Sequence, residues 1–221
     1  VKRQRPSRVA DHAVRIPLAR KLLPSLENRL GFSLTQAQQK AIREVFSDLD
    51  RSHPSLRLVQ GDVGCGKTVV AAAAALATIE AGFQVVIMAP TEILAQQHFQ
   101  TFSEWLKEFN IKPVWLTGKL NAKERRRSSN LLATGKAQIA IGTHALFQND
   151  VEYKTLGLVI VDEQHRFGVE QRAALREKGR DRNRFPHQVI MTATPKQRSM
   201  AMVCLLYTSD AADERSSVDL G

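Results

Sequence analysis

The sequence contains little cysteine and no long apolar run. Its two cysteines, Cys65 and Cys204, cannot build a disulfide framework or a four-cysteine zinc site, and such scarcity is typical of proteins in the reduced cytoplasm. The longest apolar run, Val69 to Ile79, is too short to cross a bilayer. The basic N-terminal residues are not followed by the apolar segment of a signal peptide. We therefore expect a cytoplasmic protein with no membrane association.

Negative charge and aromatic side chains are also scarce. The chain has 32 Lys and Arg against 22 Asp and Glu, a formal net charge of +10, which favours a polyanionic partner. Only two Trp and two Tyr are present, so a surface on which several bases stack is not expected. Hydrophobic residues make up 43% of the chain, which is enough for a globular core.

Short apolar runs alternate with longer amphipathic stretches. This alternation predicts an α/β fold with a mostly parallel sheet and helices on both faces. The expected strands are Leu56–Gln60, Gln84–Ala89, Pro113–Thr117, Gln138–Gly142, Leu158–Asp162 and Gln188–Thr192. One expected helix begins at Thr35. The others cover Lys67–Ala81, Glu92–Phe109, Ala122–Ala133 and Glu170–Glu177.

Composition divides the chain into three parts. Residues 1–33 are basic and contain proline, as expected of a linker remnant. Residues 34–202 carry the strand and helix alternation and are expected to form one lobe. Residues 203–221 do not continue the alternation, so we expect an atypical tail that is either disordered or foreign to the rest.

A glycine-rich loop connects the first expected strand to a helix. Its eight residues read G-x-x-x-x-G-K-T and are Gly61, Asp62, Val63, Gly64, Cys65, Gly66, Lys67 and Thr68. Glycines let consecutive backbone N–H groups surround phosphate oxygens at a helix N-terminus. Lys67 is expected to reach the β- and γ-phosphates, and the Thr68 hydroxyl to bind Mg²⁺, which predicts ATP and Mg²⁺ as cofactors. Cys65 is either an acidified thiol or, as we favour, a small residue that fits.

An acidic pair follows the buried strand Leu158–Asp162. Asp162 is expected to bind Mg²⁺ and Glu163 to polarise the attacking water, as in P-loop ATPases. The alternative is that the two acids only cap the strand. His165 either has a structural role or senses the γ-phosphate.

The motifs together resemble a known family. Gly61–Thr68, the DExH box Asp162–His165 and Thr192-Ala193-Thr194 are similar to the first, RecA-like motor lobe of superfamily 2 helicases. Four further segments closely resemble the RecG-type ATP-dependent DNA helicases: Leu34–Gln38, Ala89–His98, Gly142–Gln148 and Asp162–Val169. A lobe of a transcription-repair coupling translocase, a DExH RNA helicase lobe and a non-catalytic nucleotide- or DNA-binding module remain open as alternatives.

The resemblance implies roles for further residues. Gln38 is expected to read the adenine edge, although Thr35 to Gln38 also fits a T-x-x-Q capping box. Thr91, Gly142 and Thr143 are expected to grip the DNA backbone; an N-cap role is the alternative for Thr91. Thr192 and Thr194 are expected to link the ATP and DNA sites through hydrogen bonds to the acid box, or else only to end a strand.

The resemblance also implies an activity. RecG-type enzymes couple ATP hydrolysis to translocation on branched or forked duplex DNA in repair and recombination. The second motor lobe and the wedge domain of such enzymes have no counterpart here, so we expect a fragment, monomeric, that binds ATP–Mg²⁺ weakly and hydrolyses it slowly or not at all. The basic clusters Lys123–Arg127 and Arg166–Arg184 are either solvated faces or DNA contacts.

Overall fold

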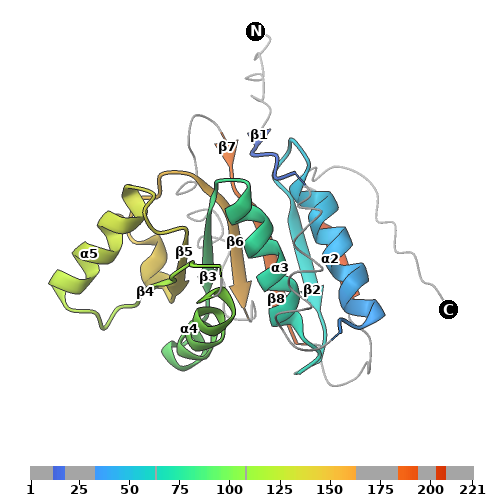
Figure 1. The fold of residues 1–221 in the computed structure, drawn as a ribbon, viewed down its shortest axis with the longest axis horizontal. Helices are drawn as coiled ribbons and strands as arrows, with labels where there is room; N and C mark the ends of the chain where they lie inside the picture. The colour runs from blue at the N-terminus through green and yellow to red at the C-terminus, as the bar shows by residue number, and fades with distance from the viewer. Residues whose placement is uncertain are drawn as a thin grey trace, which may run out of the picture.

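A seven-stranded sheet forms the centre of the molecule (Figure 1). The structure is a computed structural model that describes residues 12–17, 33–62, 64–107, 109–162 and 184–193, and the backbone of 203–207. The strand order is β4-β5-β3-β6-β8-β2-β9. The strands are β2 (Leu56–Gln60), β3 (Gln84–Met88), β4 (Val114–Leu116), β5 (Ile139–Gly142), β6 (Leu156–Asp162), β8 (His187–Thr192) and β9 (Val203–Tyr207). All pairs are parallel except β2 with β9, which confirms the predicted mostly parallel sheet.

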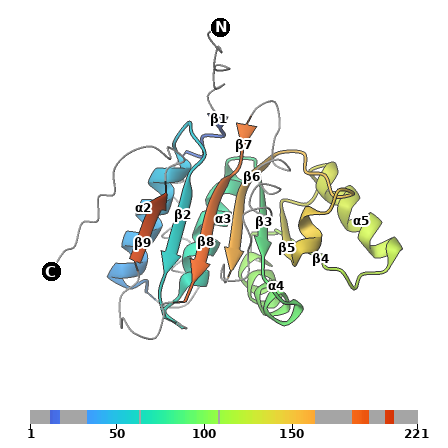
Figure 2. The same cartoon turned by 180° about the vertical axis from the view of Figure 1, so that it is seen from behind.

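Helices cover both faces of this sheet, as predicted. Their bounds are α2 (Gln36–Leu49), α3 (Lys67–Glu80), α4 (Glu92–Lys107), α5 (Ala122–Ala133) and the short 3₁₀ helix η1 (His144–Phe147). Figure 1 shows α2, α3 and α4 in front of the strands, and Figure 2 shows the same strands from the opposite side. The segment from α5 to Val151 packs on the second face.

Strand alternation divides the apolar residues between two cores. In β3, Val85 and Ile87 belong to the core under α2, α3 and α4, whereas Val86 and Met88 belong to the core with α5. Every residue of α3 from Val69 to Ile79 is buried. Because most of these residues are alanines, α3 can lie close to the sheet and its neighbours, as expected of a helix that is apolar on all sides.

Two segments outside the expected lobe also join the fold. Val203–Tyr207, which the sequence analysis placed in the tail, forms strand β9 and pairs antiparallel with β2. Its run Val-Cys-Leu-Leu-Tyr has the composition of a strand, and it covers an edge of β2. Within the expected linker, Ile16 is buried, and His12–Ala13 forms the short strand β1 beside β7 (Arg184–Phe185).

No described helix has the length and apolar character needed to span a membrane. The expected helix Glu170–Glu177 lies outside the described residues.

Candidate nucleotide-binding site

The three motifs that carry the expected chemistry meet at one edge of the sheet. Strand β8 lies between β2 and β6, and all three are parallel. Gln60 is opposite Thr192, and Asp162 is opposite Met191, so the three strands end at the same level. The Gly61 N–H donates a hydrogen bond of 3.2 Å to the Thr192 carbonyl, which joins the glycine-rich loop to the end of β8. This edge, formed by carboxyl ends of parallel strands, is where open α/β sheets bind ligands.

The glycine-rich loop has backbone angles that require glycine. Gly64 and Gly66 have φ values of 85° and 86°, in the left-handed region, and Gly66 is the N-cap of α3. A loop of this conformation at a helix N-terminus presents N–H groups to an anion, so it fits a phosphate. Val63, also expected in the cradle, lies outside the described residues.

Lys67 lies against its own loop. Its Nζ donates to the carbonyls of Gly61, at 2.6 Å, and Asp62, at 2.9 Å. These contacts place the ammonium group inside the loop, beside the N-terminus of α3. A phosphate oxygen could replace these carbonyl partners with a stronger, charge-assisted hydrogen bond. Thr68 follows on the first turn of α3 and is half-buried.

Gln38 connects α2 to the loop. The capping box is present: Thr35 Oγ1 accepts from the Gln38 N–H at 3.2 Å, and Gln38 Oε1 accepts from the Thr35 N–H at 2.9 Å. The Gln38 Nε2 group donates to the Cys65 carbonyl at 3.0 Å. A Cβ at Gly66 would lie 2.1 Å from the same Nε2, so glycine is needed for this contact. The structure thus supports the helix-capping alternative, and the adenine contact stays a prediction.

Asp162 ends β6 and is held from another element. Its Oδ2 lies 2.6 Å from Nε2 of His98, which is on α4. Both side chains are almost buried, at 14% and 11% exposed. Glu163 and His165 lie outside the described residues, so their expected roles stay predictions.

Thr91 caps the start of α4. Its Oγ1 accepts a hydrogen bond of 3.3 Å from the Leu94 N–H, as in the N-cap alternative. Lys119, in the loop before α5, forms a 2.5 Å ion pair with Glu92 in the first turn of α4. Thr91 therefore has a helix-capping role, and its expected DNA contact stays a prediction.

Gly142 and Thr143 lie where β5 passes close to β4. A Cβ at Gly142 would be 1.7 Å from the Leu116 carbonyl oxygen, so only glycine fits there. Thr143 is buried and donates its N–H to the same oxygen at 3.3 Å. Both residues serve the packing of this sheet edge, and their expected DNA contacts stay predictions.

Thr192 is bonded to the loop, and its expected bond to the acid box stays a prediction. Its backbone carbonyl accepts a hydrogen bond from the Gly61 N–H, and its Oγ1 donates one of 3.3 Å to the Ala193 carbonyl. Thr194, the second expected coupling residue, lies outside the described residues.

Comparison with known proteins identifies relatives of this chain among the helicases. The family model of DEAD/DEAH box helicases matches residues 35–203. The chain belongs to the DEAD/DEAH box helicase family. It is 54% identical over 173 residues to the ATP-dependent DNA helicase RecG of Haemophilus influenzae and 45% identical over 192 residues to that of Aquifex aeolicus. These matches cover 78% and 87% of this chain but 25% and 24% of the relatives, so the chain spans about a quarter of their length.

Solved structures agree with this family. A structure of RecG bound to a three-way DNA junction has a TM-score of 0.74 at 40% identity, covering 84% of this chain and 24% of that one. The DEAD-box helicase Mss116 bound to ssRNA and UDP-BeF has a TM-score of 0.61 at 18% identity, covers 83% of this chain and 42% of that one, and so shows the fold alone. The predicted similarity to the N-terminal helicase lobe of RecG-type proteins and the RecA-like α/β fold are confirmed.

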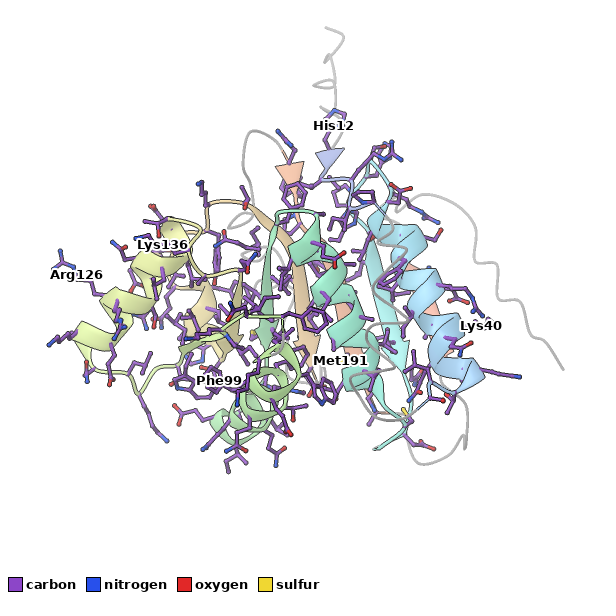
Figure 3. The ribbon with its side chains drawn as sticks, in the orientation of Figure 1. His12, Lys40, Phe99, Arg126, Lys136 and Met191 are labelled. Atoms are coloured by element: carbon purple, nitrogen blue, oxygen red, sulfur yellow. The ribbon has the colours of Figure 1, made fainter. Side chains whose placement is uncertain are left out.

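The basic cluster of this helicase lobe divides into two groups. Arg125 is bound in a bidentate pair to Asp150, with Nε–Oδ2 at 2.6 Å and Nη2–Oδ1 at 2.8 Å. The hydrogen bond to Asp150 raises the pKa of the Arg125 guanidinium further. By contrast, Lys123, Arg126 and Arg127 are exposed, and Arg126 points away from the sheet (Figure 3). Arg125 therefore holds the loop after η1, and only the other three present charge to solvent.

Sequence reasoning missed the contact between His98 and Asp162. The helical spacing did contain a signal, because Ala95, His98, Phe102 and Leu106 share the buried face of α4. A histidine on that face needs a polar partner. Its partner is 64 residues away in the sequence and could not be deduced from local pattern.

Proposed function

We propose that this chain is the ATP-binding motor lobe of a DNA helicase that couples ATP hydrolysis to translocation on branched DNA and its remodelling. The observation that carries the proposal is the shared sheet edge, where the glycine-rich loop, Thr192 and Asp162 end three adjacent parallel strands. Identity of 45–54% to RecG helicases supports this activity over that of an RNA helicase.

ATP would bind through its phosphates. The loop N–H groups and the positive end of α3 would surround the phosphate oxygens, and Lys67 would exchange the Gly61 and Asp62 carbonyls for the β- and γ-phosphates. Thr68 and Asp162 would hold Mg²⁺, which offsets the negative charge that develops on the transferred phosphoryl group. Glu163 would orient and polarise the attacking water.

DNA would bind along the neighbouring strand ends. Thr91 follows β3 and Gly142 ends β5, so both lie at the same carboxyl edge as the ATP site. The N-terminus of α4 offers N–H groups to a backbone phosphate. The similar RecG structure is bound to a three-way DNA junction, which makes branched DNA the first substrate to test.

The whole motor would need partners beyond this lobe. We propose that a second motor lobe and a wedge domain complete it, and that it works as a monomer in the cytoplasm. The present chain alone is expected to bind ATP–Mg²⁺ weakly and to turn it over slowly, because the arginine that stabilises the transferring phosphate would come from the second lobe.

DNA preference tests the proposal. Labelled three-way junction, linear duplex and RNA of equal length would be titrated with the 221-residue chain at fixed salt. We expect both DNA probes to bind more tightly than the RNA and Thr91→Ala to weaken the binding of DNA, whereas Thr134→Ala, at an exposed threonine at the end of α5, should not. Tighter binding of RNA would contradict the proposal.

The rate of ATP hydrolysis distinguishes a catalytic lobe from a non-catalytic binding module. Residual ATP hydrolysis should disappear in both Lys67→Ala and Glu163→Gln. If Glu163→Gln changed nothing measurable while Lys67→Ala abolished nucleotide binding, the non-catalytic module would be favoured. DNA-stimulated turnover of this chain at about 1 s⁻¹ or faster would contradict the expected dependence on a second lobe.

A further inference from the structure

The hydrogen bond between His98 and Asp162 joins two elements with different expected tasks. His98 Nε2 lies 2.6 Å from Asp162 Oδ2. The imidazole ring packs edge-on against Phe102, with ring centroids 6.4 Å apart and an interplanar angle of 68°. Both partners are nearly buried, at 11% and 14% exposed. The ring thus contacts both Phe102 and the carboxylate of Asp162.

The chemistry of this pair defines what the histidine can do. An ionised carboxylate only accepts hydrogen bonds, so Nε2 must carry the proton. The bond restrains rotation of the carboxylate through Oδ2, so Oδ1 would be the atom that meets a metal ion. Histidine and carboxylate partners of this kind orient metal ligands in many sites.

The position of His98 extends this role beyond the aspartate. His98 lies on α4, about two turns after Thr91, whose helix N-terminus is the proposed DNA site. Asp162 ends β6, and β8 separates β6 from β2, the strand that leads into the glycine-rich loop. A shift of α4 on DNA binding would therefore move the hydrogen-bond donor of the aspartate directly.

We propose that His98 is a positioning residue that orients Asp162 for Mg²⁺ and transmits the state of α4 to the nucleotide site. This inference rests on the proposed function. It assigns to α4 two connected ends: an exposed first turn that meets the DNA backbone and a buried histidine that sets the carboxylate. DNA binding and Mg²⁺–nucleotide binding then influence each other reciprocally.

The test compares two substitutions at this site. His98→Gln keeps an N–H donor at a similar reach, whereas His98→Leu keeps the volume and removes the donor. His53→Leu is the matched control, because His53 is exposed in the turn after α2. A fluorescent ATP analogue would be titrated with the 221-residue chain, once with Mg²⁺ and once with EDTA.

We expect His98→Leu to weaken Mg²⁺-dependent nucleotide binding about 10- to 100-fold, the usual effect of losing a partner of a metal ligand. Binding in EDTA should match that of the unmodified chain. His98→Gln should recover most of the Mg²⁺ effect, and His53→Leu should retain all of it. Branched DNA should change the Mg²⁺–nucleotide affinity of the unmodified chain but have little effect on that of His98→Leu.

Three outcomes would overturn the inference. The first is an unchanged Mg²⁺ dependence in His98→Leu while Lys67→Ala abolishes nucleotide binding; the proposed function would then survive. The second is an equal loss in His98→Leu and His98→Gln with lowered thermal midpoints, which would show a packing role only. The third is no nucleotide binding by the unmodified chain, which would end both proposals.

Discussion

Replacing Gly142 by alanine should damage the sheet edge where β5 meets β4. The added Cβ would lie 1.7 Å from the Leu116 carbonyl oxygen and 2.7 Å from its carbon. Both atoms belong to the backbone, so no side-chain rotation can relieve the clash. Strand β4 is at the end of the sheet and has only three residues, so it is the element that would move.

The cost follows from what this movement breaks. Overpacking of a buried position typically destabilises by about 1–3 kcal/mol. The Thr143 N–H would also lose its 3.3 Å hydrogen bond to Leu116, worth about 0.5–1.5 kcal/mol. We therefore expect the free energy of unfolding to fall by about 2–4 kcal/mol, which moves a urea midpoint by about 1–2 M at a slope of about 2 kcal/mol/M.

Urea unfolding followed by circular dichroism measures this loss. Gly118→Ala is the matched control, because a Cβ at Gly118 meets nothing within 4 Å. Its midpoint should stay the same or rise slightly. Equal midpoints for the two variants would refute the reasoning. A Gly142→Ala chain of unchanged stability that no longer binds DNA would instead show that the glycine serves the DNA contact.

Three further predictions concern buried polar side chains. Burial lowers the pKa of His187, whose Nε2 donates to a backbone carbonyl. The unfolded chain therefore binds the proton more readily, so the free energy of unfolding should fall as the pH drops below 6.5, by at most about 1.4 kcal/mol per pH unit. Urea titrations at several pH values should show this slope in the unmodified chain and not in His187→Gln. Arg57→Met should lower the free energy of unfolding by about 3–5 kcal/mol, because it leaves the Asp48 carboxylate, 1% exposed, without its main partner. The double variant Arg57→Met with Asp48→Leu should lose less stability than Arg57→Met alone. Additive losses from the two substitutions would contradict this. The Gln84 side-chain amide forms hydrogen bonds with three backbone groups. Gln84→Leu should therefore lower the free energy of unfolding by about 1–3 kcal/mol for each group that it leaves unpaired. An unchanged urea midpoint would contradict this.

Local sequence pattern predicted most of the sheet and its order of elements. The bounds of β2 and α5 match the prediction, because a short apolar run before the glycine-rich loop defines the strand and the Asn121 cap defines the start of the helix. Strand β6 begins two residues earlier than predicted, at Leu156, because Gly157 interrupts the apolar run. Gly157 fits there since a Cβ would meet the Phe83 side chain at 2.7 Å.

The site was predicted as a set of motifs, while its contacts were not. Periodicity placed the glycine-rich loop and Asp162 after strands, and parallel pairing brought them to one edge. By contrast, the bonds of Gln38 to Cys65 and of His98 to Asp162 span 27 and 64 residues. Such contacts depend on how α2 and α4 pack on the sheet. Strand β9 was missed although its run has the composition of a strand, because residues 203–221 do not continue the alternation of strands and helices.

The central claim is that this edge of the sheet binds ATP through Lys67. The direct measurement is the equilibrium affinity of the 221-residue chain for ATP with Mg²⁺, by isothermal titration calorimetry. We expect saturable one-site binding that Lys67→Ala reduces at least tenfold. Lys40→Ala, on the outer face of α2 (Figure 3), should leave the affinity unchanged. Equal affinities for the unmodified chain and Lys67→Ala would contradict the account.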